Sequence, residues 1–289
     1  MTITATPQSL PYFRYEPAGP ALPLVCDSPH SGTEYPADFG YAVPPALLRQ
    51  GEDTHVHTLW QAAPEIGATL IAARFPRTYI DPNRTLVDLD PEMIDGEWIE
   101  PLSPGEKTRL GKGLIWSRLD PLNPIYERRL TVDEVRSRID NYYTPYHQAL
   151  DEAVKTRYEQ FGKLWHLNLH SMPNDAYARL GLDPNRELAD FVLGDRDGTT
   201  CEPAFVALIE DYLRDRGYTV ARNDPYKGVQ LIAKIGQPAE HRHSLQIEIR
   251  RPVYMDEATR EPNEGFTKLQ KDLTGLLREV ALYVQNRVG

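Results

Sequence analysis

The stretch KLWHLNLH, residues 163–170, decides the fold, and SLQIEIRR, residues 244–251, repeats its pattern. Both stretches alternate apolar and polar side chains, which is the period of a β-strand. The polar positions are His166, Asn168 and His170 in the first stretch and Ser244, Gln246, Glu248 and Arg250 in the second. Strands inside a parallel sheet are normally apolar on both faces. A polar row there must therefore be hydrogen-bonded, solvated or bound to a ligand.

The segments around these two strands alternate between strand-like and helix-like patterns. We predict strands at 22–27, 68–73, 190–195 and 218–222, and helices at 53–63, 131–162, 201–217 and 263–286. Thr131 and Glu134 match a capping box at the start of the longest helix, which Pro145 should end or kink. The alternation predicts an α/β fold with a mostly parallel central sheet.

The domain organisation follows from what lies between these elements. Residues 86–125 are rich in proline and glycine and show little periodicity, so we expect an irregular lid or insertion there. No convincing linker separates the other segments. We therefore expect a single domain over residues 1–289.

The composition is that of a globular protein, with 40% hydrophobic and 26% charged residues among 289. The net charge of −10 argues against a nucleic-acid-binding protein, although a local basic pocket remains compatible with it. Two cysteines without a C-x-x-C motif favour a reducing compartment. Neither a signal-peptide pattern nor an apolar run of about 18 residues is present, so we expect a cytoplasmic protein without a membrane span. The oligomeric state stays open.

Polar residues gather at the carboxyl ends of three predicted strands, where open α/β sheets bind their ligands. His170 and Glu248 end two strands, and His30 follows a third in DSPHSG, residues 27–32. Two histidines and a carboxylate suit a zinc site that keeps a position for water, with a further carboxylate as general base. The compact H-E-x-x-H motif is absent. Structural hydrogen-bond networks are the alternative interpretation of the polar rows.

Seven segments, in this order, resemble the N-formylglutamate amidohydrolase (deformylase) family. They are DSPHSG (27–32), DTHVHTLW (53–60), RTYIDPNR (77–84), YTPYHQAL (143–150), LNLHSMP (167–173), NDPYKG (223–228) and LQIEIRRPVYMDE (245–257). The HSMP and Q-x-E pieces are specific when they occur together in this order. The resemblance implies a three-layer α/β/α sandwich around a zinc site, similar to zinc-dependent amidases and exopeptidases.

The resemblance also implies roles for individual residues. The expected ligands of one zinc ion, or of another divalent metal, are His30, Asp53 and His170, and the expected catalytic carboxylate is Glu248. Glu52 and Glu34 remain alternatives to Asp53 as the acidic ligand. His55 or His57 could supply an alternative ligand. The alternative interpretation of Asp53 is that it only caps its helix.

A substrate with two carboxylates needs cationic partners. The segment RTYIDPNR offers Arg77, Asn83 and Arg84, because a guanidinium binds a carboxylate bidentately. It is similar to the carboxylate-binding segment of aspartoacylase-like zinc hydrolases. Asn223 and Lys227 are further candidates, although Asn223 could simply form an Asx turn.

The implied reaction is hydrolysis of N-formyl-L-glutamate to formate and L-glutamate in histidine degradation, with Glu248 as general base and acid. Residues 92–118 depart from the usual family sequence, so the exact acyl group and amino acid stay open. The alternatives are a zinc amidase or aspartoacylase-like hydrolase of another N-acyl amino acid, a peptidoglycan amidase, and a non-catalytic protein that binds small diacids.

Overall fold

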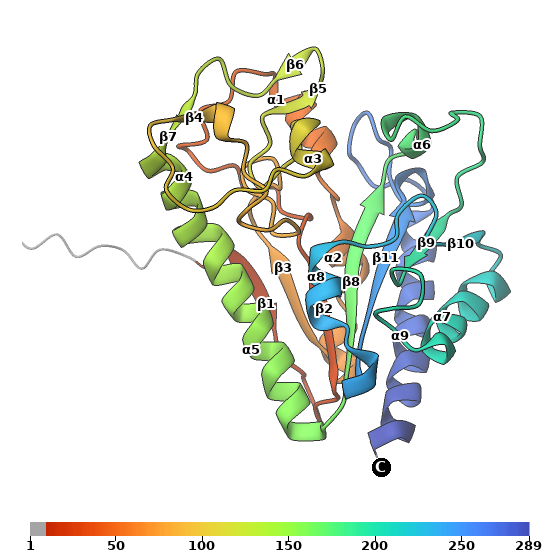
Figure 1. Ribbon diagram of the computed structural model, residues 1–289. Helices are drawn as coiled ribbons and strands as arrows, with labels where there is room; N and C mark the ends of the chain where they lie inside the picture. Colours follow the sequence, from red (N-terminus) through yellow and green to blue (C-terminus); the bar gives the residue numbers. More distant parts are fainter. Residues whose placement is uncertain (1–9, 289) are drawn as a thin grey trace, which may run out of the picture.

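The computed structural model describes residues 10–288, and a seven-stranded sheet lies at its centre (Figure 1). The order of the strands across the sheet is β1-β3-β2-β8-β11-β9-β10. Their bounds are β1 Tyr12–Tyr15, β2 Leu24–Ser28, β3 Thr69–Ala73, β8 Leu164–Met172, β9 Phe191–Gly194, β10 Val220–Arg222 and β11 Arg242–Arg250. Every strand predicted from the sequence is present within two residues of its expected ends.

The direction of the strands is mixed but mostly parallel. The four central strands β3, β2, β8 and β11 run parallel to one another. β1 is antiparallel to β3, and β9 is antiparallel to β11, while β10 is parallel to β9. The predicted α/β class with a mostly parallel sheet is therefore confirmed. The carboxyl ends of all four central strands lie at one edge, which is where the polar residues were expected to meet.

Helices cover both faces of the sheet and complete three layers (Figure 1). α2 (Val56–Leu59), α7 (Pro203–Asp215) and α9 (Phe266–Val288) share one core cluster with the apolar residues of β8 and β11. α5 (Thr144–Phe161) and α8 (Gln230–Ile235) share the cluster on the other face. The first core contains Trp165, Leu167 and Leu169, so the alternate polar residues of β8 point toward α5 and α8.

The longest predicted helix continues through its proline. It consists of α4 (Val132–Arg138), a π-helical turn (Ile139–Tyr143) and α5. The capping box is present, because Thr131 Oγ1 accepts from the Glu134 N–H at 3.2 Å and Glu134 Oε2 accepts from the Thr131 N–H at 2.8 Å. Pro145 follows the π turn directly. Since proline lacks an N–H and crowds the preceding turn, the wider turn lets the chain stay helical.

The helix expected at 53–63 is much shorter than predicted. Only Val56–Leu59 is α-helical, followed by a 3₁₀ turn at Ala63–Ile66. Asp53 does not cap this helix, since the N-cap position is His55, a left-handed residue (φ 69°) without a side-chain cap. The carboxylate of Asp53 is instead bonded to Arg251 and His170. Tertiary contacts thus override the local helical pattern.

Residues 86–125 are irregular, as expected, but contain short ordered pieces. These are the 3₁₀ turn Pro91–Met93, β4 Ile94–Asp95, α3 Glu106–Arg109, β5 Arg118–Asp120 and β6 Asn123–Pro124. β4 pairs with β7 (Leu130–Thr131), and β5 pairs with β6. The remaining short helical turns are α1 Pro45–Leu48, Arg49–Gly51, α6 Ala176–Arg179, Pro238–Glu240 and Arg251–Val253. Across residues 10–288, no helix has both the length and the apolar character to cross a membrane.

Candidate active site

The two polar rows of the sequence lie side by side in the centre of the sheet. The parallel register of β8 and β11 pairs His166 with Ser244, Asn168 with Gln246, and His170 with Glu248. On the other side of β8, Asp27 of β2 pairs with Asn168. All seven side chains are buried. His170 and Glu248 are therefore neighbours near the carboxyl ends of adjacent strands.

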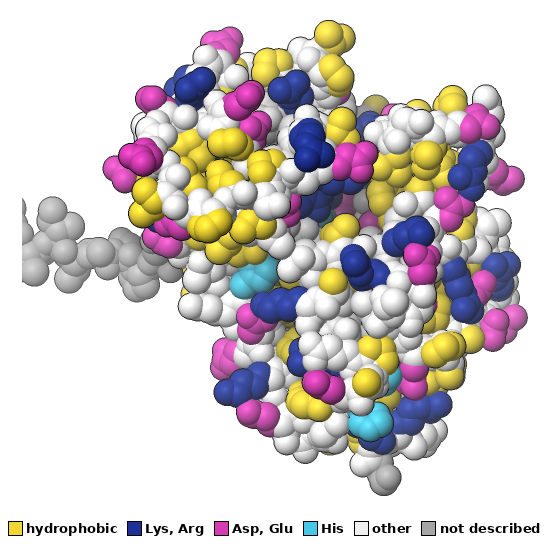
Figure 2. Space-filling view, in the orientation of Figure 1, with side chains coloured by type: hydrophobic (Ala, Val, Ile, Leu, Met, Phe, Trp, Pro, Cys, Tyr) yellow, Lys and Arg dark blue, Asp and Glu magenta, His cyan; other side chains and the backbone are white. Residues whose placement is uncertain are grey.

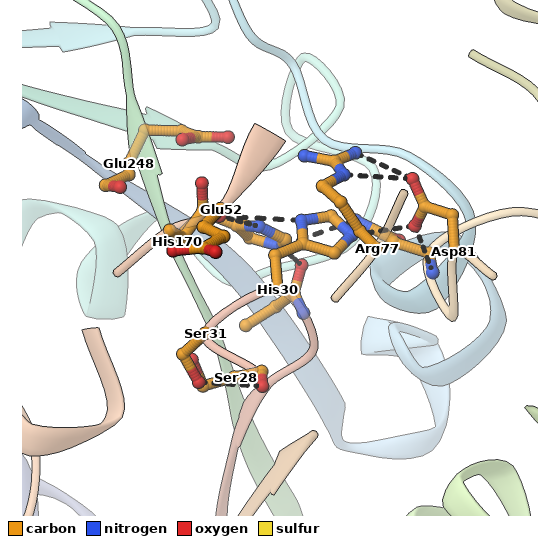
Figure 3. A network of polar contacts seen from close by, with 12 residues as sticks. Ser28, His30, Ser31, Glu52, Arg77, Asp81, His170 and Glu248 are labelled. Atoms are coloured by element: carbon orange, nitrogen blue, oxygen red, sulfur yellow. Dashed lines mark hydrogen bonds and ion pairs between the residues drawn. The ribbon is translucent and has the colours of Figure 1, made fainter. Parts of the chain in front are cut away.

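His30, Asp53 and His170 converge at this edge of the sheet. One ligand atom from each lies within 4.8 Å of the others. Asp53 Oδ2 is 3.2 Å from His170 Nδ1 and 3.5 Å from His30 Nδ1, and the two imidazole rings are 4.7 Å apart between centroids. Figure 3 shows the rings of His30 and His170 side by side. The structure thus brings together the three residues that the sequence suggested as metal ligands.

Local backbone contacts bring the loop segments to this cluster. His30 lies two residues beyond β2, and its carbonyl accepts from the Asp53 N–H at 2.9 Å, which joins the two ligand segments. Gly32 passes directly against the backbone of Phe75, and a Cβ there would lie only 2.2 Å from its carbonyl oxygen. Only glycine fits such a close approach, which accounts for the glycine after the histidine in the DSPHSG segment.

The tautomer of His30 is fixed by Asp81. His30 Nε2 lies 2.7 Å from Asp81 Oδ1 (Figure 3). An ionised carboxylate only accepts hydrogen bonds, so Nε2 carries the hydrogen and Nδ1 carries the lone pair. Burial tends to raise the pKa of Asp81, but Arg77, His30 and Arg84 hold it well below its usual range. His30 Nδ1 is buried without a hydrogen-bond partner in the described part of the chain.

The tautomer of His170 is fixed in the same way through two further residues. Asn168 Nδ2 donates to Asp27 Oδ1 at 2.7 Å, which turns Asn168 Oδ1 toward His170 Nε2, also at 2.7 Å. His170 therefore donates from Nε2 and directs the lone pair of Nδ1 at Asp53. Asp27 also accepts from Tyr146 and His166. Burial tends to raise the pKa of Asp27, but the bonds from His166, Asn168 and Tyr146 keep it below its usual value.

Asp53 presents one oxygen to the histidines because the other is occupied. Arg251 Nη2 donates to Asp53 Oδ1 at 3.1 Å, while Oδ2 faces the two rings. Burial opposes the charge of Asp53, yet the neighbouring imidazoles of His170 and His30 and the charge of Arg251 hold its pKa well below the usual range. Two imidazole nitrogens and one carboxylate oxygen, each oriented by a second hydrogen bond, fit a zinc ion.

The other acidic candidates are engaged elsewhere. Glu52 is buried and accepts from Tyr35 at 2.7 Å and Thr54 at 2.9 Å, so its carboxylate is not part of the cluster. Glu34 is on the surface, paired with Arg74 at 2.8 Å. Among the alternative histidines, His55 bonds the carbonyl of Arg260 and His57 stacks on Phe13. The geometry therefore favours Asp53 as the acidic ligand.

Glu248 has the properties of a proton-transfer group. It is buried, and its Oε1 accepts from Gln246 Nε2 at 2.9 Å. Burial raises the pKa of Glu248 to about 7, with a further increase from the charge of Asp53 and opposing effects from His170, Arg77 and Arg251. A carboxyl group that titrates near neutrality can take up and release a proton under working conditions.

A pocket of about 150 Å³ opens over the cluster and Glu248. Six basic side chains line it: Arg77, Arg84, Lys107, Lys112, Arg179 and Arg251. Among residues 10–288, Glu248 is the only acidic residue in its wall. Figure 2 shows a hollow between the segments of α3 and α6, with Lys and Arg side chains inside it. In a chain with a net charge of −10, this local excess of positive charge indicates an anionic ligand.

Three of the five predicted substrate-binding residues line this pocket: Arg77, Asn83 and Arg84. Arg77 donates to Asp81 from Nε and Nη2, at 3.1 and 2.8 Å, which leaves Nη1 for a ligand. Arg84 donates from Nε and Nη1 to two backbone carbonyls, which leaves Nη2. The side chain of Asn83 lies 3.3 Å from His170 Nε2.

The other two, Asn223 and Lys227, do not line the pocket. Asn223 has a left-handed backbone (φ 57°), and its Oδ1 accepts from the N–H groups of Asp195 and Asp197. The side chain of Lys227 is exposed and pairs with Asp197 at 2.8 Å. The turn interpretation of Asn223 agrees with this placement, and we assign neither residue to ligand binding.

Several residues at the site escaped sequence reasoning. Asp81 and Arg251 orient the expected ligands, and Lys107, Lys112 and Arg179 add charge to the pocket. Asp81 belongs to the same DPNR segment as Asn83 and Arg84, and Arg251 directly follows β11, so both had a positional signal. Lys107 and Arg179 lie in the one-turn helices α3 and α6, and Lys112 lies in an irregular segment. None of these segments has a sequence periodicity that would point to a pocket.

Comparisons with known proteins identify the family of the chain. A model of the N-formylglutamate amidohydrolase family matches residues 22–255. The chain is 29% identical over 240 residues to the N-formylglutamate deformylase of Pseudomonas aeruginosa, covering 82% of this chain and 83% of the relative. The deformylase of Pseudomonas putida is 27% identical over 244 residues, with the same coverage.

Solved structures give the same result. The crystal structure of N-formylglutamate amidohydrolase from Ralstonia eutropha JMP134 is 66% identical, with a TM-score of 0.95, and the match covers 96% of this chain and 99% of that one. A gene product of Agrobacterium tumefaciens shares the fold, with a TM-score of 0.66 at 17% identity over 97% and 96% of the two chains. On the family match and these likenesses, the chain belongs to the N-formylglutamate amidohydrolase family.

Proposed function

We propose that this protein hydrolyses N-formyl-L-glutamate to formate and L-glutamate, with one zinc ion held by His30, Asp53 and His170. The observation that carries the proposal is the buried cluster of these three side chains next to Glu248, under a pocket lined by basic residues. The names of the relatives, N-formylglutamate deformylase and amidohydrolase, support the same substrate. The reaction belongs to histidine degradation, which we place in the cytoplasm.

The residues around the cluster have separate roles in the proposed reaction. Zinc bound at the cluster would supply Lewis-acid chemistry, which makes a water molecule acidic near neutral pH. Glu248 takes a proton from the water that attacks the formyl carbon and then delivers this proton to the amine nitrogen of the leaving glutamate. Its pKa near 7 suits both transfers. The hydrogen bonds to Asp81 and Asn168 keep both histidines in the tautomer that ligation requires.

The substrate is held by the basic side chains nearest the cluster. Arg77 and Arg84 each keep one guanidinium nitrogen for a carboxylate of the substrate, and Asn83 lies next to His170. Residues 86–125 contribute Lys107, Lys112 and Trp116 to the pocket wall. We propose that this segment shapes the pocket within a single domain, whether or not it moves as a lid.

The test is formate release from N-formyl-L-glutamate by the purified protein, measured before and after treatment with a chelator and after adding zinc back. We expect activity that disappears with the chelator and returns with zinc. Zinc bound at about one ion per chain without formate release would contradict the substrate while retaining the metal site. Other N-acyl amino acids would then be screened. Formate release that resists the chelator would contradict the metal site.

A further inference from the structure

Four of the six basic side chains of the pocket form two groups that differ in their acidic partners, while Arg179 pairs with Asp175 and Arg251 with Asp53. Arg77 and Arg84 both contact Asp81, at 2.8 and 3.9 Å. Lys107 and Lys112 are different, because within residues 10–288 neither ammonium group has an acidic side chain within 4.0 Å. We call Arg77 and Arg84 the inner pair and Lys107 and Lys112 the outer pair.

Lys112 of the outer pair and Arg77 of the inner pair both contact the ring of Trp116, and the Lys112 N–H donates to the Lys107 carbonyl at 2.8 Å. The guanidinium of Arg77 lies 5.0 Å from the centre of the Trp116 ring, and Lys112 Nζ lies 5.6 Å from it. Trp116 is buried, and its Nε1 donates to Asp81 at 3.3 Å, which fixes the ring to the inner group. The backbone of the 107–114 segment is fixed as well, since the Leu114 carbonyl accepts from the Asp81 N–H at 2.7 Å.

The outer pair is placed under electrostatic strain that an anion would relieve. Both lysines are half-buried in the wall of the pocket. Burial lowers the pKa of Lys112 to about 8, and the charges of Arg179, Arg77 and Lys107 lower it further against the opposing charge of Asp120. Burial also lowers the pKa of Lys107, together with the charges of Arg84 and Arg77 and against the opposing charge of Glu106. Partly desolvated like charges repel, so an anion bound between them is stabilised.

We propose that Lys107 and Lys112 form a second carboxylate subsite, which holds the side-chain carboxylate of a dicarboxylic N-acyl amino acid. The inference rests on the proposed function and deepens it by naming the residues that select the amino acid. The α-carboxylate sits on the carbon that carries the scissile amide, so it must stay beside the metal cluster and the inner pair. The side-chain carboxylate lies several bonds further out, and the outer pair offers it positive charge that no acidic side chain of the described residues neutralises within 4.0 Å.

The subsite is tested by comparing two substrates that differ in one charge. The ratio of kcat/KM for N-formyl-L-glutamate to that for N-formyl-L-glutamine is measured in the wild type and in Lys112→Met, Lys107→Met and the double variant. We expect the ratio to fall about 10- to 100-fold in the double variant, because a charge-assisted contact is lost only for glutamate. Lys112→Arg keeps the charge and should retain most of the ratio. Lys155→Met, which removes an exposed lysine of α5, is the matched control.

The outcomes separate this inference from the proposed function. An equal loss of kcat/KM for both substrates, or an unchanged ratio, would overturn the subsite while leaving the deformylase reaction intact. If the wild type releases no formate from either substrate, binding of glutarate and butyrate is compared by calorimetry. Tighter binding of glutarate that is lost in the double variant would support the subsite although the proposed reaction fails. Equal binding of the two acids would overturn it. Thermal unfolding of each variant checks that the fold is retained.

Discussion

Replacing Asp81 with asparagine should disturb the metal site although the two side chains have the same shape. Five hydrogen-bond donors point at the carboxylate of Asp81. His30 Nε2 and the Asn83 N–H donate to Oδ1 at 2.7 and 2.9 Å, and Arg77 Nε, Arg77 Nη2 and Trp116 Nε1 donate to Oδ2 at 3.1, 2.8 and 3.3 Å. An amide accepts on one side only, so its NH₂ must face donors in either orientation.

The two orientations differ in cost. If the NH₂ takes the position of Oδ2, it faces three donors, namely Nε and Nη2 of Arg77 and the indole N–H of Trp116. The guanidinium of Arg77 cannot lose its charge to relieve this conflict. An NH₂ turned toward His30 leaves the Asn83 N–H without an acceptor, at about 1–3 kcal/mol. His30 can adapt by moving its hydrogen to Nδ1. We expect the second orientation, in which Nδ1 no longer offers a lone pair and zinc affinity falls about 10- to 100-fold.

Stability should change with pH in a defined direction. The pKa of Asp81 is held well below its usual range in the folded state. Its ionised form therefore stabilises the metal-free protein fully above the unfolded-state pKa of about 3.9, and this contribution is lost as the pH falls through the lower folded-state pKa. The difference in unfolding free energy between the wild type and Asp81→Asn should be constant near neutrality and shrink in acid.

Three measurements check this reasoning. Competition with a chromophoric chelator gives the zinc affinity, nitrogen NMR of the metal-free protein gives the tautomer of His30, and denaturant unfolding gives the stability. Asp38→Asn is the matched control, since Asp38 accepts only from the Tyr79 hydroxyl in the described structure. Zinc binding as tight as in the wild type, with the hydrogen still on Nε2 of His30, would refute the argument that Asp81 sets the tautomer.

Three further predictions concern single residues. Glu248→Gln should keep its zinc, as measured by metal content, and its kcat for formate release should fall about 10²- to 10⁴-fold. A variant with wild-type kcat would exclude Glu248 as the proton-transfer group. The KM for N-formyl-L-glutamate should rise as the pH increases through about 8, because Lys112 then loses its charge; Lys112→Arg should flatten this rise, and an unchanged profile would contradict the assignment. Asn223→Ala should lower the unfolding free energy by about 2–4 kcal/mol, because it removes three hydrogen bonds and leaves alanine with a positive φ. Its KM should stay within about twofold of the wild type, and a large increase would return Asn223 to the substrate site.

Much of the fold and part of the site follow from strand periodicity. Alternation along 163–170 and 244–251 fixes which side chains share a face, and the parallel register then places His170 beside Glu248. The faces follow from the local sequence alone, and the pairing of His170 with Glu248 requires in addition only that the two strands are neighbours. The prediction of a helix over 53–63 was wrong, because the contacts of Asp53 with Arg251 and His170 outweigh a local helical preference.

The rest of the site depends on contacts between distant, irregular segments. Asp81 meets His30 across 51 positions, and Arg251 meets Asp53 across 198. Asp81 and the outer lysines lie in segments whose conformation is set by their surroundings rather than by a repeating pattern. Sequence spacing therefore cannot show which of many polar residues face the pocket. Only the resemblance to a known family pointed at the DPNR segment, and it did not point at Lys107 or Lys112.

The polar row of β8 ends at His170, which belongs to the cluster of His30, Asp53 and His170, and this cluster explains why the row is polar. Asp81 accepts the hydrogen on Nε2 of His30 directly, and Asp27 orients Asn168, which accepts the hydrogen on Nε2 of His170. The Nδ1 atoms of both histidines then direct lone pairs toward the same oxygen of Asp53. Three electron-rich atoms facing one another in a buried space repel unless a cation lies among them. Either a proton or a metal ion must therefore lie among these three atoms, so metal binding should displace a proton. The buried aspartates thus make the site selective for a cation before any ligand binds.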